Sequence, residues 1–322
     1  MVPDKLTLDD QIRVIAPAQS LLPKLTLDKR LRAIERLEQI GLRVSFGDYI
    51  SEVDEFHSTS VEHRLNDLHN ALRDPAVKAI LAVAGGTTSN QLLPHINYNL
   101  INDNPKIICG ISDITALNNA LFAKTGLVTY YGPHFNIFGA SEDISYTLEY
   151  FKRCLFSSAP FALSPPHVFY NSPWEEEPVN NTGYWVINEG ECKGKILGGN
   201  FLTFSLLNGS EYMPDIRGAV LFLEDNGPES AGNMQNQLQS LINHSDFDHV
   251  QGLVIGRFKQ ESGITRKLLT KIIKTKEPLS RIPVVANVDF GHTTPMITFP
   301  IGGYVRIQAH KDNIYIEISD HE

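Results

Sequence analysis

The sequence predicts an α/β protein in which a mostly parallel sheet is covered by helices on both faces. Short apolar runs alternate with segments of helical periodicity through the first 160 residues, and this alternation is typical of doubly wound sheets. The run 77–86 (VKAILAVAGG) is apolar almost throughout, as expected of a strand that helices cover on both faces. Both observations favour a parallel sheet for the first half of the chain.

The first predicted elements follow one another in βαβ order. Residues 11–18 (QIRVIAPA) are short, β-branched and closed by Pro17, so they predict a strand. Residues 26–41 predict a helix that ends at Gly41. Its expected apolar face consists of Leu27, Leu31, Ile34, Leu37 and Ile40. Residues 42–47 (LRVSFG) predict the next strand.

The pattern continues to about residue 156. Residues 59–74 predict a helix that opens with the capping box Thr59-x-x-Glu62. The apolar runs PKIICGIS and GLVTYYGP predict two further strands with a helix at 113–124 between them. A last amphipathic helix is predicted at 141–156.

The periodicity breaks at 157–185, a stretch with five prolines that predicts a long crossing segment. After it, GKILGGN, GAVLFLED, GLVIGRF and IPVVANVDF predict apolar strands, with helices near 230–243 and 264–274 between them. The alternation around Lys311-Asp312-Asn313 predicts a β-hairpin. We therefore expect an N-terminal α/β domain (1–160), a linker and substrate loop (161–182) and a mixed, β-rich C-terminal domain (183–322).

Composition and charge exclude several classes of protein. The net charge is −9 and the pI about 5.7, which argues against binding to a nucleic acid polymer or an anionic membrane. No apolar run approaches the length of a membrane span, and the N-terminus lacks the features of a secretory signal. Three widely spaced cysteines form no disulfide or metal pattern. These observations predict a cytoplasmic protein.

Ser112 stands where a predicted strand turns sharply into a helix (CGISDIT). A serine at such a turn can be a nucleophile with an exposed hydroxyl, or it can be a helix cap. The segment departs from the G-x-S-x-G pattern because residue 114 is isoleucine. Taken alone, the segment favours capping.

A nucleophilic serine needs a base and an orienting acid, and both have candidates at strand ends. His292 directly follows an apolar strand and Gly291, and Glu224 closes the run AVLFLED. An acid at the end of so apolar a run must find a partner. The other histidines show no metal-ligand spacing, so neither a metal nor another cofactor is expected. The turn at Gly85-Gly86 also follows a strand and can present backbone amides.

Several segments together resemble the LD-carboxypeptidase family of serine peptidases: VIAPAQS, the stretch from AVAGGTTSNQLLP to LVTYYGP, GKILGGN, LFLED and GHTTPMITFPIGG. The resemblance implies a Ser112–His292–Glu224 triad, with the backbone amides of Gly86 and Asp113 as the oxyanion hole. It also implies a Rossmann-like (flavodoxin-like) N-terminal domain, a β-rich C-terminal domain, a site between them and a homodimer.

Within the family, GGTTSNQLLP, YYGPH, PWEEEP and EYMP are similar to the microcin C immunity peptidases. Muropeptide-cleaving members have arginine before the double glycine, where this chain has Ala84. The resemblance implies hydrolysis of an amide between an aminoacyl or peptidyl group and a nucleotide-like group. Trp174 takes the position of a base-stacking tryptophan, with Trp185 the weaker candidate. The alternative for Trp174 is that it only anchors its loop to the core.

Three alternatives stay open at this point. One is a muropeptide LD-carboxypeptidase of cell-wall recycling. A second is a glutamine-amidotransferase-like enzyme with Cys109 as nucleophile, although a cysteine inside a strand favours buried packing. The third is a non-catalytic protein that binds a small molecule.

Overall fold

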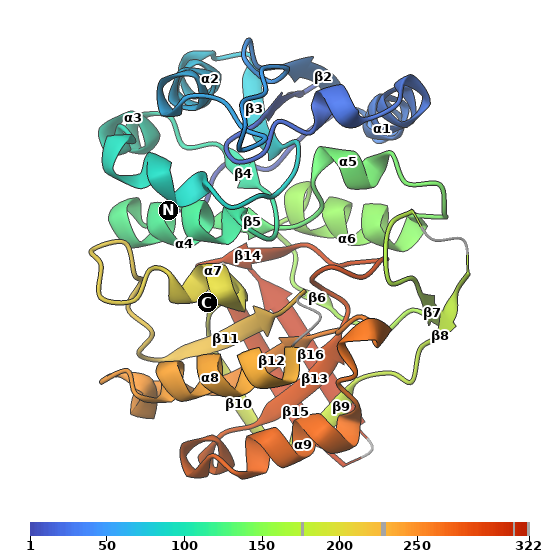
Figure 1. Ribbon diagram of the computed structural model, residues 1–322, viewed down its shortest axis with the longest axis vertical. Helices are drawn as coiled ribbons and strands as arrows, with labels where there is room; N and C mark the ends of the chain where they lie inside the picture. The colour runs from blue at the N-terminus through green and yellow to red at the C-terminus, as the bar shows by residue number, and fades with distance from the viewer. Residues whose placement is uncertain (175–176, 227–229, 312, 321–322) are drawn as a thin grey trace.

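The computed structural model describes residues 1–174, 177–226, 230–311 and 313–320. It has two α/β domains, one above the other in Figure 1, each built on its own sheet. The helices α4 and α7 and the strand β14 lie where the two domains meet (Figure 1). The predicted fold class is confirmed.

The N-terminal sheet has six strands in the order β14-β5-β4-β3-β1-β2. Its strands are β1 (Gln11–Ile15), β2 (Arg43–Phe46), β3 (Val77–Ala82), β4 (Ile107–Cys109), β5 (Thr129–Tyr131) and β14 (Phe299–Ile301). The first five are parallel, and their order is that of flavodoxin-like sheets. β14 comes from the far end of the chain and adds antiparallel to β5.

The C-terminal sheet has eight strands in the order β6-β16-β15-β10-β11-β12-β13-β9. Its strands are β6 (Phe161–Ala162), β9 (Trp185–Asn188), β10 (Gly190–Asn200), β11 (Ala219–Glu224), β12 (Gly252–Gly256), β13 (Val284–Val288), β15 (Tyr304–His310) and β16 (Asn313–Ser319). β10 to β13 are parallel to one another. β15 and β16 pair antiparallel, as the hairpin prediction required.

Nine α-helices lie in the part of the chain that the structure describes. They are α1 (Leu27–Gln39), α2 (Val61–Arg73), α3 (Tyr98–Asp103), α4 (Ile114–Thr125), α5 (Phe135–Phe138), α6 (Ser145–Leu155), α7 (Phe201–Ser205), α8 (Ser230–Ile242) and α9 (Arg266–Lys274). The 3₁₀ turns are η1 (Leu22–Lys24), η2 (Ser89–His95), η3 (Phe247–His249), η4 (Gln260–Ser262) and η5 (Glu277–Arg281). No helix of these described residues is long and apolar enough to cross a membrane.

Two local predictions need correction. The cap of α2 is Ser60, whose side chain accepts from His63 N–H, because the hydroxyl of Thr59 donates to Glu52 instead. On α1, Leu27 and Leu31 are mostly exposed, so the buried face of this helix is narrower than its apolar periodicity suggested.

The crossing segment contains two further short strands, β7 (Val168–Phe169) and β8 (Val179–Asn180), which pair with each other. The division of the chain at 160 and 183 stays a prediction. Nevertheless, β14 shows that the C-terminal part completes the N-terminal sheet.

The helix α4 is buried on every side over its first eight residues, as expected of a helix packed between two layers. Asn119 on α4 exchanges hydrogen bonds with Gly198 of β10, donating to its carbonyl at 2.7 Å and accepting from its N–H at 3.2 Å. The hydroxyl of Thr115 accepts from Asn200 N–H at 2.9 Å. These three hydrogen bonds join α4 to β10. They therefore fix the turn before α4, which contains Ser112, relative to the C-terminal sheet.

Candidate active site

Ser112 lies in the turn between β4 and α4, with its backbone at φ +57°. This left-handed conformation is costly for residues other than glycine and is often kept at functional sites. The N-cap of α4 is Asp113, so Ser112 does not occupy the capping position. A Cβ built on Gly85 would lie 2.9 Å from Ser112 Cβ, so the absence of a side chain at Gly85 leaves room for the serine.

Glu224 and His292 form a hydrogen-bonded pair at the carboxyl ends of the C-terminal strands. Glu224 is the last residue of β11 and is fully buried, and its Oε2 lies 2.8 Å from His292 Nδ1. His292 follows β13 through Gly291, where a Cβ would lie 2.8 Å from Glu224 Oε2. The glycine therefore allows the chain to pass close to the carboxylate.

The second oxygen of Glu224 is also satisfied. Tyr131 donates its hydroxyl to Oε1 at 2.8 Å, and Asn200 donates its amide to the same oxygen at 3.0 Å. Burial alone would raise the pKa of Glu224, but the charge and hydrogen bonds of these neighbours and of His292 outweigh it, so the pKa lies below its usual value. Glu224 is thus held as a carboxylate.

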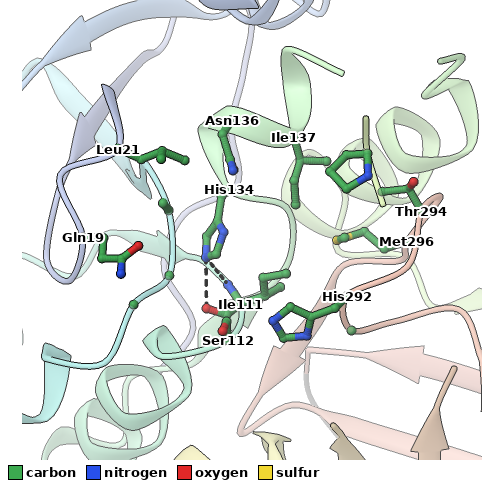
Figure 2. Close-up of a pocket in the computed structure, with 15 residues that line it drawn as sticks. Gln19, Leu21, Ile111, Ser112, His134, Asn136, Ile137, His292, Thr294 and Met296 are labelled. Atoms are coloured by element: carbon green, nitrogen blue, oxygen red, sulfur yellow. Dashed lines mark hydrogen bonds between the residues drawn. The ribbon is translucent and has the colours of Figure 1, made fainter. Parts of the chain in front are cut away.

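Ser112 and His292 line the same cavity, which encloses about 250 Å³ between the two domains. Figure 2 shows the His292 ring facing Ser112 across this space. Since Nδ1 of His292 is engaged by Glu224, Nε2 is the nitrogen available to a reacting group. The cavity wall is completed by Gln19, Leu21, Ala84, Gly85, Gly86, Ile111, His134, Asn136, Ile137, Pro173, Gly291, Thr294 and Met296.

The cavity lies where the carboxyl ends of both parallel sheets meet, the usual place for a site in α/β proteins. Gln19, Gly85 and Ser112 follow β1, β3 and β4 of the N-terminal sheet. Glu224 and His292 come from β11 and the segment after β13 of the other sheet. Neither domain alone brings the serine and the histidine together.

Gly86 and Asp113 are the residues predicted to form the oxyanion hole. Gly86 lies in the glycine turn after β3 and Asp113 directly follows Ser112, and their role stays a prediction. Gly86 lines the cavity. The carboxylate of Asp113 accepts from the N–H groups of Thr88 and Ser89 at 2.9 and 2.8 Å, so it ties the glycine turn to the start of α4. Burial raises the pKa of Asp113.

Trp174 lies beside the cavity rather than in its wall. Its neighbour Pro173 lines the cavity, while the indole packs partly against the core and Lys29 Nζ lies 3.8 Å from the ring centroid. Residues 175 and 176 of the same loop lie outside the described residues. Trp185 sits in β9 and donates its indole N–H to Thr182. Base stacking by either residue stays a prediction.

The cysteine alternative loses support from the structure. Cys109 is buried in β4 and burial raises the pKa of its thiol, whereas a nucleophilic cysteine needs an accessible thiolate. All three cysteines are free thiols. Among the described residues, no group of three or more His, Cys, Asp and Glu side chains could hold a metal ion.

Three site residues were not singled out from the sequence. Tyr131 and Asn200 hold Glu224, and His134 forms part of the cavity wall. Tyr131 and His134 lie in YYGPH, and Asn200 ends GKILGGN. Polar residues at the ends of apolar strands were the available signal, the same one that indicated Glu224.

Comparisons with known proteins agree with this architecture. Residues 12–132 match the LD-carboxypeptidase N-terminal domain and residues 193–307 match the LD-carboxypeptidase C-terminal domain. A candidate carboxypeptidase of Bacillus subtilis (strain 168), YocD, is 43% identical over 326 residues, with both chains fully covered.

Solved structures show the same relationship. An MccF-like protein from Bacillus anthracis superposes with a TM-score of 0.97 at 43% identity, over the whole of both chains. The microcin C7 self immunity protein MccF, in complex with aspartyl sulfamoyl adenosine, has a TM-score of 0.88 at 28% identity, covering 100% of this chain and 99% of the other. The two domain matches and these relatives show that the chain belongs to the LD-carboxypeptidase family, a family of peptidases.

Proposed function

We propose that the protein is a serine peptidase that hydrolyses an amide between an aminoacyl or peptidyl group and a nucleotide-like group. One observation carries the chemistry: the Glu224–His292 pair, with 2.8 Å between Oε2 and Nδ1, faces Ser112 across one cavity. A buried acid, an imidazole and a hydroxyl in this order are the parts of a catalytic triad.

In the proposed cycle, His292 Nε2 removes the proton of Ser112 while Glu224 orients the ring and stabilises the imidazolium. The Ser112 oxygen attacks the amide carbonyl and forms a tetrahedral intermediate. His292 then donates the proton to the leaving nitrogen, the C–N bond breaks, and an acyl-enzyme remains. Water, activated by the same imidazole, releases the acyl group and restores the serine.

The backbone N–H groups of Gly86 and Asp113 would stabilise the oxyanion. Among the hydrogen bonds formed by the described part of the chain, neither N–H has an acceptor. Asp113 lies at the start of α4, where free donors and the helix dipole favour negative charge. One such donor typically contributes about 10²–10³ in rate.

The cavity wall favours a nucleotide-like amide over a muropeptide. No Lys or Arg occurs among the described residues that line it, and Ala84 occupies the position before the double glycine. A peptide that ends in a free carboxylate beside the scissile bond would find no cation there, whereas a sulfonyl or phosphoryl oxygen at that position can also be bound by neutral donors. The related MccF binds aspartyl sulfamoyl adenosine, and Trp174, the neighbour of Pro173 in the wall, is the residue we propose to stack on the base.

We further propose that the protein works in the cytoplasm, as a homodimer, without metal or other cofactor. Three free cysteines, two of them fully buried, suit a reducing compartment. The exposed leucines Leu27 and Leu31 on α1, and Leu202 on α7 with Leu206 at its C-cap, offer apolar contact surface. Sedimentation equilibrium tests the dimer: a single species of 36 kDa across the concentration range would contradict it.

The substrate assignment is tested by a side-by-side mass-spectrometric assay. One substrate is an aminoacyl-sulfamoyl adenosine and the other a tetrapeptide muropeptide, each incubated with wild-type protein and with Ser112→Ala. We expect cleavage of the first substrate by the wild type alone. Cleavage of only the muropeptide would establish cell-wall recycling instead. Tight binding without cleavage of either would indicate a non-catalytic binding protein.

A further inference from the structure

One wall of the active-site cavity carries a histidine that the proposed triad does not use. His134 follows β5 and is buried, with its ring in the cavity wall near Ser112. A Cβ built on Gly85 would lie 3.1 Å from Ser112 Oγ and 3.3 Å from His134 Cε1. The two side chains therefore flank the same glycine, and the position of the histidine's proton matters to the site.

The hydrogen bonds of Ile111 decide where that proton lies. Nε2 of His134 is 3.1 Å from Ile111 N and 3.0 Å from Ile111 O. The carbonyl already accepts from Ile114 N–H at 3.1 Å, whereas the buried Ile111 N–H has no other acceptor among the hydrogen bonds of the described residues. Since buried N–H groups are almost always paired, Nε2 accepts from Ile111. A neutral imidazole then carries its proton on Nδ1.

Figure 2 shows how the His134 ring lies in the cavity wall. The nitrogen of His134 that bonds Ile111 faces the Ser112 turn, and the opposite edge of the ring faces the interior of the cavity. No hydrogen bond within the described part of the chain engages Nδ1. His134 therefore presents a neutral donor in a wall whose described residues include no Lys or Arg.

We propose that His134 binds the substrate and positions the nucleophile at the same time. Through Nε2 it holds the Ile111 N–H and so fixes the turn that carries Ser112. Through Nδ1–H it donates a hydrogen bond to a carbonyl, sulfonyl or phosphoryl oxygen next to the scissile amide. The substrate half of this inference rests on the proposed function; the proton assignment does not.

The proton assignment is tested by ¹⁵N–¹H correlation spectra of protein labelled at histidine, with His134→Gln used to identify the signals. We expect the pattern of an Nδ1–H tautomer in the free protein. In the Ser112→Ala variant, addition of aspartyl sulfamoyl adenosine should shift the Nδ1–H proton downfield. A proton on Nε2, or an Nδ1–H that does not move in the saturated complex, would overturn the proposal.

Two substitutions separate the two roles in catalysis. His134→Gln can place an amide oxygen near the position of Nε2 and keep the acceptor for Ile111, but it has no donor at Nδ1. His134→Asn can keep a donor near Nδ1 and loses the acceptor. We expect His134→Gln to raise KM about tenfold, the loss of one hydrogen bond, and His134→Asn to lower kcat with a smaller change in KM.

The control is His249→Gln, the same substitution at an exposed histidine of η3, which should keep wild-type kinetics. Wild-type kcat/KM in His134→Gln would reject the substrate contact. If the wild type cleaves no nucleotide amide at all, the proposed function fails, while the spectra of the free protein still decide the tautomer.

Discussion

Glu224 Oε2 and His292 Nδ1 lie 2.8 Å apart, although 68 residues separate them along the chain. The carboxylate is fully buried and held as an anion by Tyr131 and Asn200 as well as by the histidine. These partners stabilise the negative charge of Glu224. The carboxylate in turn binds Nδ1 of His292 and so orients the ring with Nε2 toward Ser112.

Glu224→Gln should therefore lower kcat by about 10³–10⁴-fold while the protein stays folded. The amide keeps the shape but removes the charge that stabilises the imidazolium, a loss of this size in other triads. Tyr131→Phe removes only one neutral donor to Oε1 and should cost about tenfold. Steady-state kinetics measure kcat of both variants, and circular dichroism checks that they are folded. Equal kcat in Glu224→Gln and wild type would show that Glu224 has no part in the mechanism.

The left-handed backbone of Ser112 predicts an unusual stability ranking. At φ +57° glycine is less strained than alanine, so Ser112→Gly should be more stable than Ser112→Ala by about 1 kcal/mol. Ser240 is exposed within α8, where the ranking should reverse, with Gly less stable than Ala by about 1 kcal/mol. Denaturant unfolding of the four variants measures both. If the Gly and Ala variants rank in the same order at positions 112 and 240, the backbone of Ser112 is not strained.

Substitution of Trp174 tests whether its indole stacks on the substrate base or only anchors the loop to the core. If the indole stacks on the substrate base, Trp174→Ala should raise KM for a nucleotide amide by about 10-fold or more, since stacking contributes about 1–3 kcal/mol per base, with little change in kcat. Lys29→Met removes the cation above the ring but leaves the indole, so it should keep a near-normal KM. A Trp174→Ala protein that loses stability while its KM is unchanged would make this residue an anchor only.

The lowered pKa of buried His134 predicts that the free energy of unfolding depends on pH. Burial, together with the charge of His292, lowers the pKa of His134 to about 3, against about 6.5 when the chain is unfolded. Between these values the unfolded chain binds more protons, so the free energy of unfolding falls as pH drops, by up to about 1.4 kcal/mol per pH unit. His134→Gln should show a shallower fall than wild type between pH 6.5 and 4, whereas His249→Gln should not. Denaturant titrations at several pH values test this, and identical slopes in wild type and His134→Gln would refute it.

The sequence predicted the fold where periodicity and burial agree. The alternation of strands and helices anticipated the parallel sheet, and apolar strands that end in polar residues anticipated Glu224 and His292 at one edge. The flavodoxin-like order came from the family resemblance. Local patterns failed where a partner outside the pattern competes: Thr59 bonds Glu52 rather than capping α2, and β14 pairs with the other domain's sheet.

The contacts that complete the site could not be read from spacing. Tyr131 lies 93 residues from Glu224 and Asn200 lies 24 residues from it, and nothing in a periodic pattern pairs such positions. The proton of His134 depends on which atoms of Ile111 are already satisfied, which only three-dimensional structure reveals.

The most direct test of the account is covalent trapping of Ser112. A fluorophosphonate probe reacts with a serine only when a base activates it, and peptide mapping by mass spectrometry then locates the label. We expect stoichiometric labelling at Ser112 in the wild type, at least about 10³-fold slower labelling in His292→Ala, and none in Ser112→Ala. Labelling at another residue, or equal labelling of wild type and Ser112→Ala, would contradict the triad.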